Sequence, residues 1–117
     1  MSSAAYRRVI EAITRVRGVR GAMLVAAADG LIVADALMEG IRGNAVAALA
    51  ASLVKRVGNA SEASGVGRPH FVQLRGTEGM LLTLPTGEEL LLVAVADPDV
   101  NVGLVRLEML RAAEGLA

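Results

Sequence analysis

Apolar side chains recur at two different spacings along this chain, and the changes of spacing predict where helices and strands alternate. Near the start they return every three or four positions, which predicts an amphipathic helix. Ser2 or Ser3 can cap its beginning, and Gly18 suits an end near residue 17. The apolar stripe of this helix consists of Tyr6, Val9, Ile10, Ile13 and Val16.

Short apolar runs predict five strands. Residues 22–27 and 31–36 flank Asp29-Gly30, a pair typical of hairpin turns because glycine adopts the positive φ that such turns require. Three more runs occupy residues 70–74, 80–84 and 89–96, with glycine-containing turns at residues 76–79 and 85–87. These segments predict one hairpin followed by a three-strand meander.

Residues 41–63 predict a second helix with two apolar stripes, where a surface helix needs only one. The larger side chains of the first stripe suit packing on the sheet. The smaller residues of the second stripe would let another backbone approach closely. The first stripe contains Val46, Leu49, Leu53, Val57 and Ala60. The second contains Ala47, Ala51, Val54 and Gly58.

The stretch "ADPDVNVGLVR" at residues 96–106 joins the last strand to a helix predicted at residues 101–116. Pro98 pushes the residue before it out of helical geometry, so Asp97 is expected to end the strand. Asp97, Asp99 and Asn101 are alternative caps for the helix. Gly103 is expected to permit close packing of the first helical turn on the sheet.

The predicted order is helix, two strands, helix, three strands, helix. Strands and helices do not alternate one by one, which argues against a parallel Rossmann-like sheet. We therefore predict an α+β fold with a five-stranded antiparallel sheet flanked by helices, in the order α-β-β-α-β-β-β-α. A chain of 117 residues suits one domain, residues 1–117.

The composition indicates an aliphatic core and a self-associating surface. Hydrophobic residues make up 54% of the chain and aromatic residues only 2%. A chain this short and apolar is expected to hide part of its surface against another subunit. The net charge of zero argues against a nucleic-acid-binding protein that relies on electrostatics. The absence of cysteine excludes disulfides and thiolate metal sites.

Residues suited to catalysis are few. His70 is the only histidine, and the metalloprotease, P-loop and nucleophile-elbow motifs are absent. Asp29, Asp35, Asp97 and Asp99 could pair around calcium or magnesium, but turn and capping roles account for all four. We expect no catalytic, cofactor-binding or metal-binding residues.

The sequence also lacks targeting signals. Its N-terminus has no apolar core of the kind found in signal peptides, and no apolar run approaches the ~18 residues that span a membrane. We therefore expect a cytoplasmic protein that does not insert into membranes.

Together, these features resemble the Roadblock/LC7 domain family. Three segments carry the resemblance: "GVRGAMLVAAADGLIVADA" at residues 18–36, "NAVAALAASLVKRVG" at residues 44–58, and "LLLVAVADPDVNVGLVRLEMLRAAEGL" at residues 90–116. Each motif alone is loose, and their order and spacing make the match.

The resemblance implies an α/β sandwich of the profilin/longin-like kind. It implies a homodimer in which the second helices pack side by side and the strand edges join into one sheet. It also implies a non-catalytic protein that binds a small Ras-like GTPase, as the bacterial MglB-type members do when they stimulate GTP hydrolysis.

Carried onto this sequence, the resemblance places the partner or dimer interface on the small-residue side of the second helix and on the strand at residues 70–74. The doubly apolar helix and the expected strand edge favour the same surface. The interface residues are Ala47, Ala48, Ala51, Ser52, Val54, Lys55, Gly58, His70, Phe71, Val72, Gln73 and Leu74.

Two alternatives stay open. The chain could be a structural dimer that assembles other proteins without a GTPase partner. It could also be a small-ligand sensor with a cavity beside the sheet, although few polar groups converge in the sequence to form one.

Overall fold

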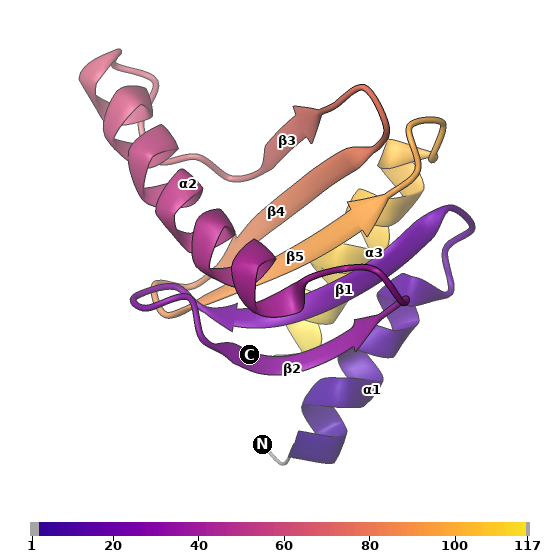
Figure 1. Ribbon diagram of the computed structural model, residues 1–117. Helices are drawn as coiled ribbons and strands as arrows, with labels where there is room; N and C mark the ends of the chain where they lie inside the picture. The colour runs from indigo at the N-terminus through magenta and orange to yellow at the C-terminus, as the bar shows by residue number, and fades with distance from the viewer. Residues whose placement is uncertain (1–2, 117) are drawn as a thin grey trace.

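The computed structural model describes residues 3–116 and consists of one antiparallel sheet with helices on both faces. Figure 1 shows α1 and α3 on one face of the sheet and α2 crossing the other. The elements are α1 (Ser3–Thr14), β1 (Val19–Ala26), β2 (Ile32–Leu37), α2 (Gly43–Ala63), β3 (Val72–Arg75), β4 (Met80–Thr86), β5 (Leu90–Ala96) and α3 (Val102–Gly115). The α+β fold and its element order are as predicted.

The five strands lie in the order β2-β1-β5-β4-β3, and every neighbouring pair is antiparallel. The hairpin β1–β2 and the meander β3–β4–β5 therefore meet where β1 pairs with β5 in the middle of the sheet. β2 and β3 are the two edges. β3 is the shortest strand, and it pairs with β4 alone.

Several boundaries differ from the sequence expectation. α1 ends at Thr14, whose hydroxyl donates to the carbonyl of Glu11, and the chain then turns through Gly18 at φ +95°. Capping of α1 by Ser2 or by the side chain of Ser3 lies outside the described residues. β4 continues through Pro85 to Thr86. Proline lacks a backbone N–H, and it is tolerated here because β3 no longer pairs with β4 beyond Thr83, so one side of β4 is a free edge.

The sheet separates two apolar cores. On the α1–α3 side, residues of the two helices pack on the sheet, including Ile10, Ile13, Leu82, Leu92 and Met109. The core on the α2 side is smaller, and the sheet contributes larger side chains to it than the helix does. The sheet contributes Met23, Val25, Leu91 and Val93, whereas α2 contributes Ala47, Ala50 and Ala51.

The expected division of the two α2 stripes is therefore wrong. The small residues Ala47 and Ala51 face the sheet, and the larger Leu49 is 69% exposed. The physical reason is volume, because long side chains on β1 and β5 fill most of the space. The fully buried helix residues are therefore alanines, and Val46 and Val54 are only partly buried against this core.

The β1–β2 connection is also longer than a two-residue turn. It spans residues 27–31, and the N–H of Gly30 donates to the carbonyl of Ala26 at 2.9 Å. Gly30 has φ +73°, as a glycine turn requires, and it is buried against α2. A Cβ built on Gly30 would lie 2.7 Å from the Cα of Ala48, so the hairpin touches the helix backbone.

Asn101 is the cap of α3, one of the three alternatives that the sequence left open. Its side-chain oxygen accepts from the N–H of Leu104 at 3.0 Å. Gly103 is exposed, and a Cβ there would meet only the Asn101 side chain at 3.5 Å. The expected close packing of Gly103 on the sheet is therefore wrong.

Candidate functional site

The small-residue side of α2 is divided between the chain's own core and its surface. Ala47 and Ala51 are buried on the sheet, which removes them from any surface that a partner could touch. Val54 and Gly58 are half-buried further along the helix. The exposed residues of the expected interface on α2 are Ala48, Ser52 and Lys55.

This exposed flank of α2 is partly occupied by the β1–β2 hairpin. Lys55 donates from Nζ to the carbonyl oxygen of Ala28 at 2.9 Å, and Gly30 lies against Ala48. The hairpin thus contacts the helix at two places about two turns apart. A second protein approaching here would meet the hairpin before it met much of the helix.

The opposite flank of α2 has no such cover. At 100° per residue, Leu53 and Val57 lie about 160° round the helix from Lys55, away from the hairpin. Both are half-buried, and Leu49 one turn earlier is mostly exposed. Figure 1 shows that β4 and β3 lie on this side of α2.

The edge strand β3 supplies apolar side chains on the same face of the sheet. Val72 pairs with Thr83 and Leu74 with Leu81, and Leu81 packs against the core under α2. Because directly paired residues of an antiparallel ladder share a face, Val72 and Leu74 point to the α2 side. Leu74 is 49% exposed.

The remaining residues expected on this strand lie elsewhere. His70 and Phe71 precede β3, and Phe71 packs on the α3 side, with the guanidinium carbon of Arg106 5.3 Å from its ring centre. Gln73 pairs with Leu82, which places it on the α3 side of the sheet. Only Val72 and Leu74 of the five therefore share a face with α2.

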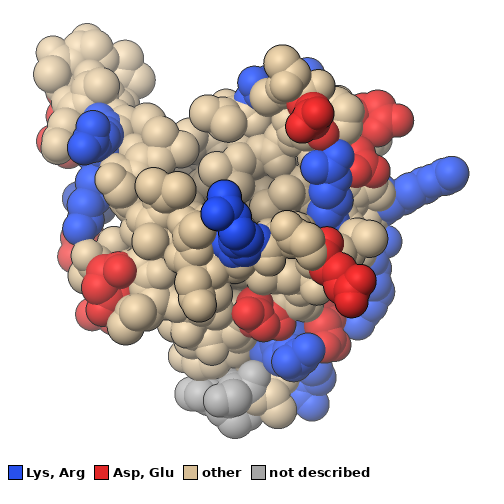
Figure 2. All heavy atoms as spheres, viewed as in Figure 1, with Lys and Arg blue, Asp and Glu red and all other residues tan. Residues whose placement is uncertain are grey.

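We name the resulting surface the α2–β3 surface, made of Leu49, Leu53, Val57, Val72 and Leu74. Figure 2 shows a largely uncharged region here, with a notch beside the projecting end of α2. The sequence did not single out Leu49, Leu53 and Val57 as interface residues. The large side chains on β1 and β5 were the available signal, because they leave no room for leucine under the helix.

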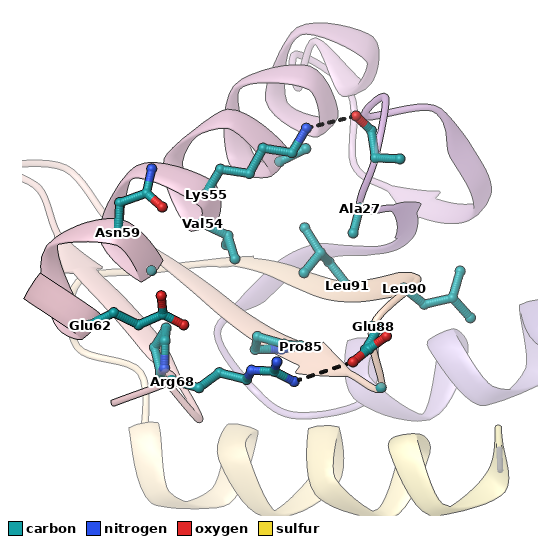
Figure 3. Close-up of a pocket in the computed structure, with 15 residues that line it drawn as sticks. Ala27, Val54, Lys55, Asn59, Glu62, Arg68, Pro85, Glu88, Leu90 and Leu91 are labelled. Atoms are coloured by element: carbon teal, nitrogen blue, oxygen red, sulfur yellow. Dashed lines mark hydrogen bonds and ion pairs between the residues drawn. The ribbon is translucent and has the colours of Figure 1, made fainter. Parts of the chain in front are cut away.

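A cleft of about 390 Å³ opens on the hairpin side, between the second half of α2 and the β4–β5 turn (Figure 3). Val54, Leu90 and Leu91 line its apolar part. Its charged groups are of both signs, and Arg68 and Glu88 pair across it at 3.8 Å. With two cations and two carboxylates around it, the cleft has no net charge to select a ligand.

The described part of the chain contains little that could perform metal chemistry. Within residues 3–116, no three histidine, aspartate or glutamate side chains lie together in a way that could hold a metal ion. None of the helices in that range is both long and apolar enough to cross a bilayer. The features that stand out are surfaces suited to binding other proteins.

Comparison with known proteins identifies the family. The Roadblock/LC7 domain pattern matches residues 6–96. The chain belongs to the Roadblock/LC7 domain family. Its relatives include two proteins of Methanocaldococcus jannaschii, MJ1340 and MJ0714, which are 32% and 33% identical to it over 107 residues. The alignments cover 92% of this chain, and 92% and 89% of those proteins respectively.

Solved structures agree with this assignment. The gliding protein MglB of Thermus thermophilus has a TM-score of 0.85 at 26% identity, covering 97% of this chain and 87% of that one. An MglB with a tetrameric arrangement has a TM-score of 0.87 at 29% identity, covering 100% and 90%. Profilin IA of Acanthamoeba castellanii, at 19% identity, shares the fold with a TM-score of 0.62 over 95% of both chains. The predicted profilin-like architecture is confirmed.

Proposed function

We propose that this Roadblock/LC7 domain is a homodimeric regulator or scaffold that binds a small Ras-like GTPase. Family membership and the likeness to MglB proteins support a regulatory role over an enzymatic one. In this proposal the GTPase hydrolyses GTP, and the domain acts by binding the GTPase and altering its rate of GTP hydrolysis.

The observation that carries the proposal is the α2–β3 surface. It combines an exposed leucine on α2, Leu49, with an edge strand whose outer side has no neighbouring strand. An uncovered apolar flank and an unpaired strand edge both favour association with a second copy. A two-fold axis beside β3 would pair the two β3 edges and bring both α2 helices together.

The proposed interface differs from the one expected from sequence alone. Leu49, Leu53 and Val57 replace Ala47 and Ala51 as the helix contacts. Val72 and Leu74 remain from the strand. Lys55, Ser52 and Ala48 lie on the other flank beside the hairpin, so a further partner such as the GTPase would meet them together with the hairpin.

Sedimentation equilibrium tests the dimer. We expect the wild-type chain to sediment as a dimer and the variants Leu49→Glu and Leu74→Lys to sediment as monomers, because each places a charge in an apolar contact. Leu31→Glu is the matched control, because Leu31 is 65% exposed and lies outside the surface. A wild-type monomer, or dimers that survive both charged variants, would refute the interface.

Titration with a GTPase tests the regulatory role separately. A Ras-like GTPase from the same genome, loaded with a non-hydrolysable GTP analogue, is expected to bind the wild-type dimer. Single-turnover GTP hydrolysis then measures whether the bound domain raises the rate. Absence of binding by a protein that dimerises normally would leave the dimer intact and remove the GTPase from the proposal.

The structural alternative has one observation in its favour. A solved MglB relative at 29% identity is described with a tetrameric arrangement. If this chain forms tetramers and binds no GTPase, its role is assembly rather than GTPase regulation. The same sedimentation experiment, run over a range of concentrations, distinguishes a dimer from a tetramer.

A further inference from the structure

The outer side of α3 carries a row of exposed leucines. Val105, Met109 and Ala112 of this helix are buried on the sheet. Leu104, Leu107 and Leu110 lie three residues apart on its other sides and are 41–44% exposed. Figure 1 shows α3 on the face of the sheet opposite α2, so these leucines are far from the α2–β3 surface.

A groove of about 440 Å³ runs beside the second half of α3. One wall is α3 itself, with Leu110 and Ala113, and the floor includes Leu84 of β4. The other wall is the loop that precedes β3, with Arg68 and His70. The groove is therefore apolar inside and continuous with the leucine row through Leu110.

Basic side chains border this groove. Arg106 and Arg68 line it beside His70, and among the described residues that line it the one carboxylate is that of Glu88, which pairs with Arg68. Arg106 lies over the Phe71 ring, and among the described residues no carboxylate pairs with it. The stacking holds a guanidinium beside the groove with its donors available to an incoming anion.

The helical layer carries more arginines than glutamates, mostly on α1 and the turn after it, whereas α3 itself has two of each. Residues 3–18 and 101–116 together carry six arginines and three glutamates. The arginines are Arg7, Arg8, Arg15, Arg17, Arg106 and Arg111. Arg106 beside the groove, unpaired within the described residues, together with the excess of arginine on this layer, favours an acidic partner here.

We propose that the α3 face, made of Leu104, Leu107, Leu110, Arg106 and the adjoining groove, binds an acidic amphipathic helix of another protein. Leucines of the incoming helix would pack along the leucine row and into the groove, and its carboxylates would pair with Arg106. This surface and the α2–β3 surface lie on opposite faces, so both can be occupied together.

Other occupants fit this face less well. A second copy would offer only the same residues, and because the two glutamates of α3 balance its two arginines, it has no excess of carboxylate for Arg106. A bilayer is flat on this scale and does not fill a groove of 440 Å³. A helix has both the width and the side-chain spacing to do so.

Fluorescence anisotropy with a designed probe tests the proposal. The probe is a labelled peptide with leucine at helical spacing and glutamate at its other positions. Two control peptides replace glutamate by lysine or scramble the sequence. We expect the wild-type protein to bind the acidic probe, to bind both controls more weakly, and to lose affinity as salt is raised.

Variants locate the site. Arg106→Glu and the milder Arg106→Gln are each expected to weaken binding by about tenfold or more, as loss of a charge-assisted contact predicts. Leu110→Ser should weaken binding to a similar extent, because it removes an apolar side chain from the wall of the groove. Arg56→Glu, an exposed arginine on α2, is the matched control and should bind like wild type. Circular dichroism verifies that each variant is folded.

Three outcomes would overturn the proposal. These are no binding of the acidic probe, an equal loss with Arg56→Glu, and binding to phosphatidylglycerol-containing vesicles without binding to the peptide. The proposal is independent of the dimer, so the monomeric Leu49→Glu variant should bind the probe with unchanged affinity. A lower affinity in that variant would place the probe on the α2–β3 surface and refute the assignment.

Discussion

Arg20 of β1 and Asp97, just after β5, form an ion pair with 2.7 Å between Nε and Oδ1. The same guanidinium donates from Nη2 to the carbonyl oxygen of Glu78 at 2.7 Å. One arginine therefore joins the first strand, the end of the last strand and the β3–β4 turn. Asp97, which the sequence indicated as a strand terminator or helix cap, is a partner in this long-range contact.

Replacing Asp97 by asparagine is expected to lower the free energy of unfolding by about 1 kcal/mol, the upper range for a partly exposed pair with a charge-assisted hydrogen bond. Urea unfolding measures the difference. Glu11→Gln is the control, because Glu11 pairs with Arg7 on the surface of one helix at 3.1 Å and should contribute less. An equal drop in the free energy of unfolding for the two variants would show that the Arg20–Asp97 pair contributes no more stability than the Arg7–Glu11 pair.

Gly30→Ala is expected to destabilise the chain by about 2 kcal/mol or more. Alanine is strained at φ +73°, and its Cβ would lie 2.7 Å from the Cα of Ala48, so hairpin and helix would have to separate. Thermal unfolding and urea unfolding both report the loss.

Gly87→Ala separates the two causes. Gly87 has φ +69°, close to that of Gly30, and a Cβ there would meet nothing within 4 Å. Its substitution therefore measures backbone strain alone. A Gly30→Ala loss no larger than the Gly87→Ala loss would mean that the hairpin does not press on α2.

The Arg20–Asp97 pair and the contact of Gly30 with Ala48 also show what the sequence could and could not predict. The element order followed from local hydrophobic spacing and turn chemistry. The sequence reduced the cap of α3 to three candidates, and the structure selects Asn101. The Arg20–Asp97 pair joins residues 77 positions apart, and neither residue carries a local sign of the other.

The face of α2 that packs on the sheet was predicted wrongly for a related reason. The helix offers two apolar stripes, and its own sequence does not decide between them. The choice depends on Met23, Val25, Leu91 and Val93, which lie on other elements and fill most of the space. Apolar volume across the whole layer, rather than helix periodicity, determines which stripe is buried.

Thr83→Val is expected to stabilise the fold by about 1 kcal/mol. Thr83 is 1% exposed on β4, and its hydroxyl oxygen has no hydrogen-bond partner in the described part of the chain. Valine has nearly the same shape, suits a strand and removes the desolvation cost of that hydroxyl. A higher urea midpoint with an unchanged slope would show it. The exposed Thr77→Val should leave the midpoint unchanged, and a destabilised Thr83→Val would mean that the hydroxyl is satisfied.

Asn101→Ala is expected to cost about 1 kcal/mol, the usual value for losing a side-chain cap, because the N–H of Leu104 would lose its acceptor. Asp99→Ala tests the competing cap. Asp99 is exposed two residues earlier, so only a weak helix-dipole interaction of about 0.3 kcal/mol is at stake there. Urea unfolding of both variants, with hydrogen exchange at the Leu104 amide, distinguishes them. Faster exchange at that amide in Asp99→Ala than in Asn101→Ala would transfer the capping role to the aspartate.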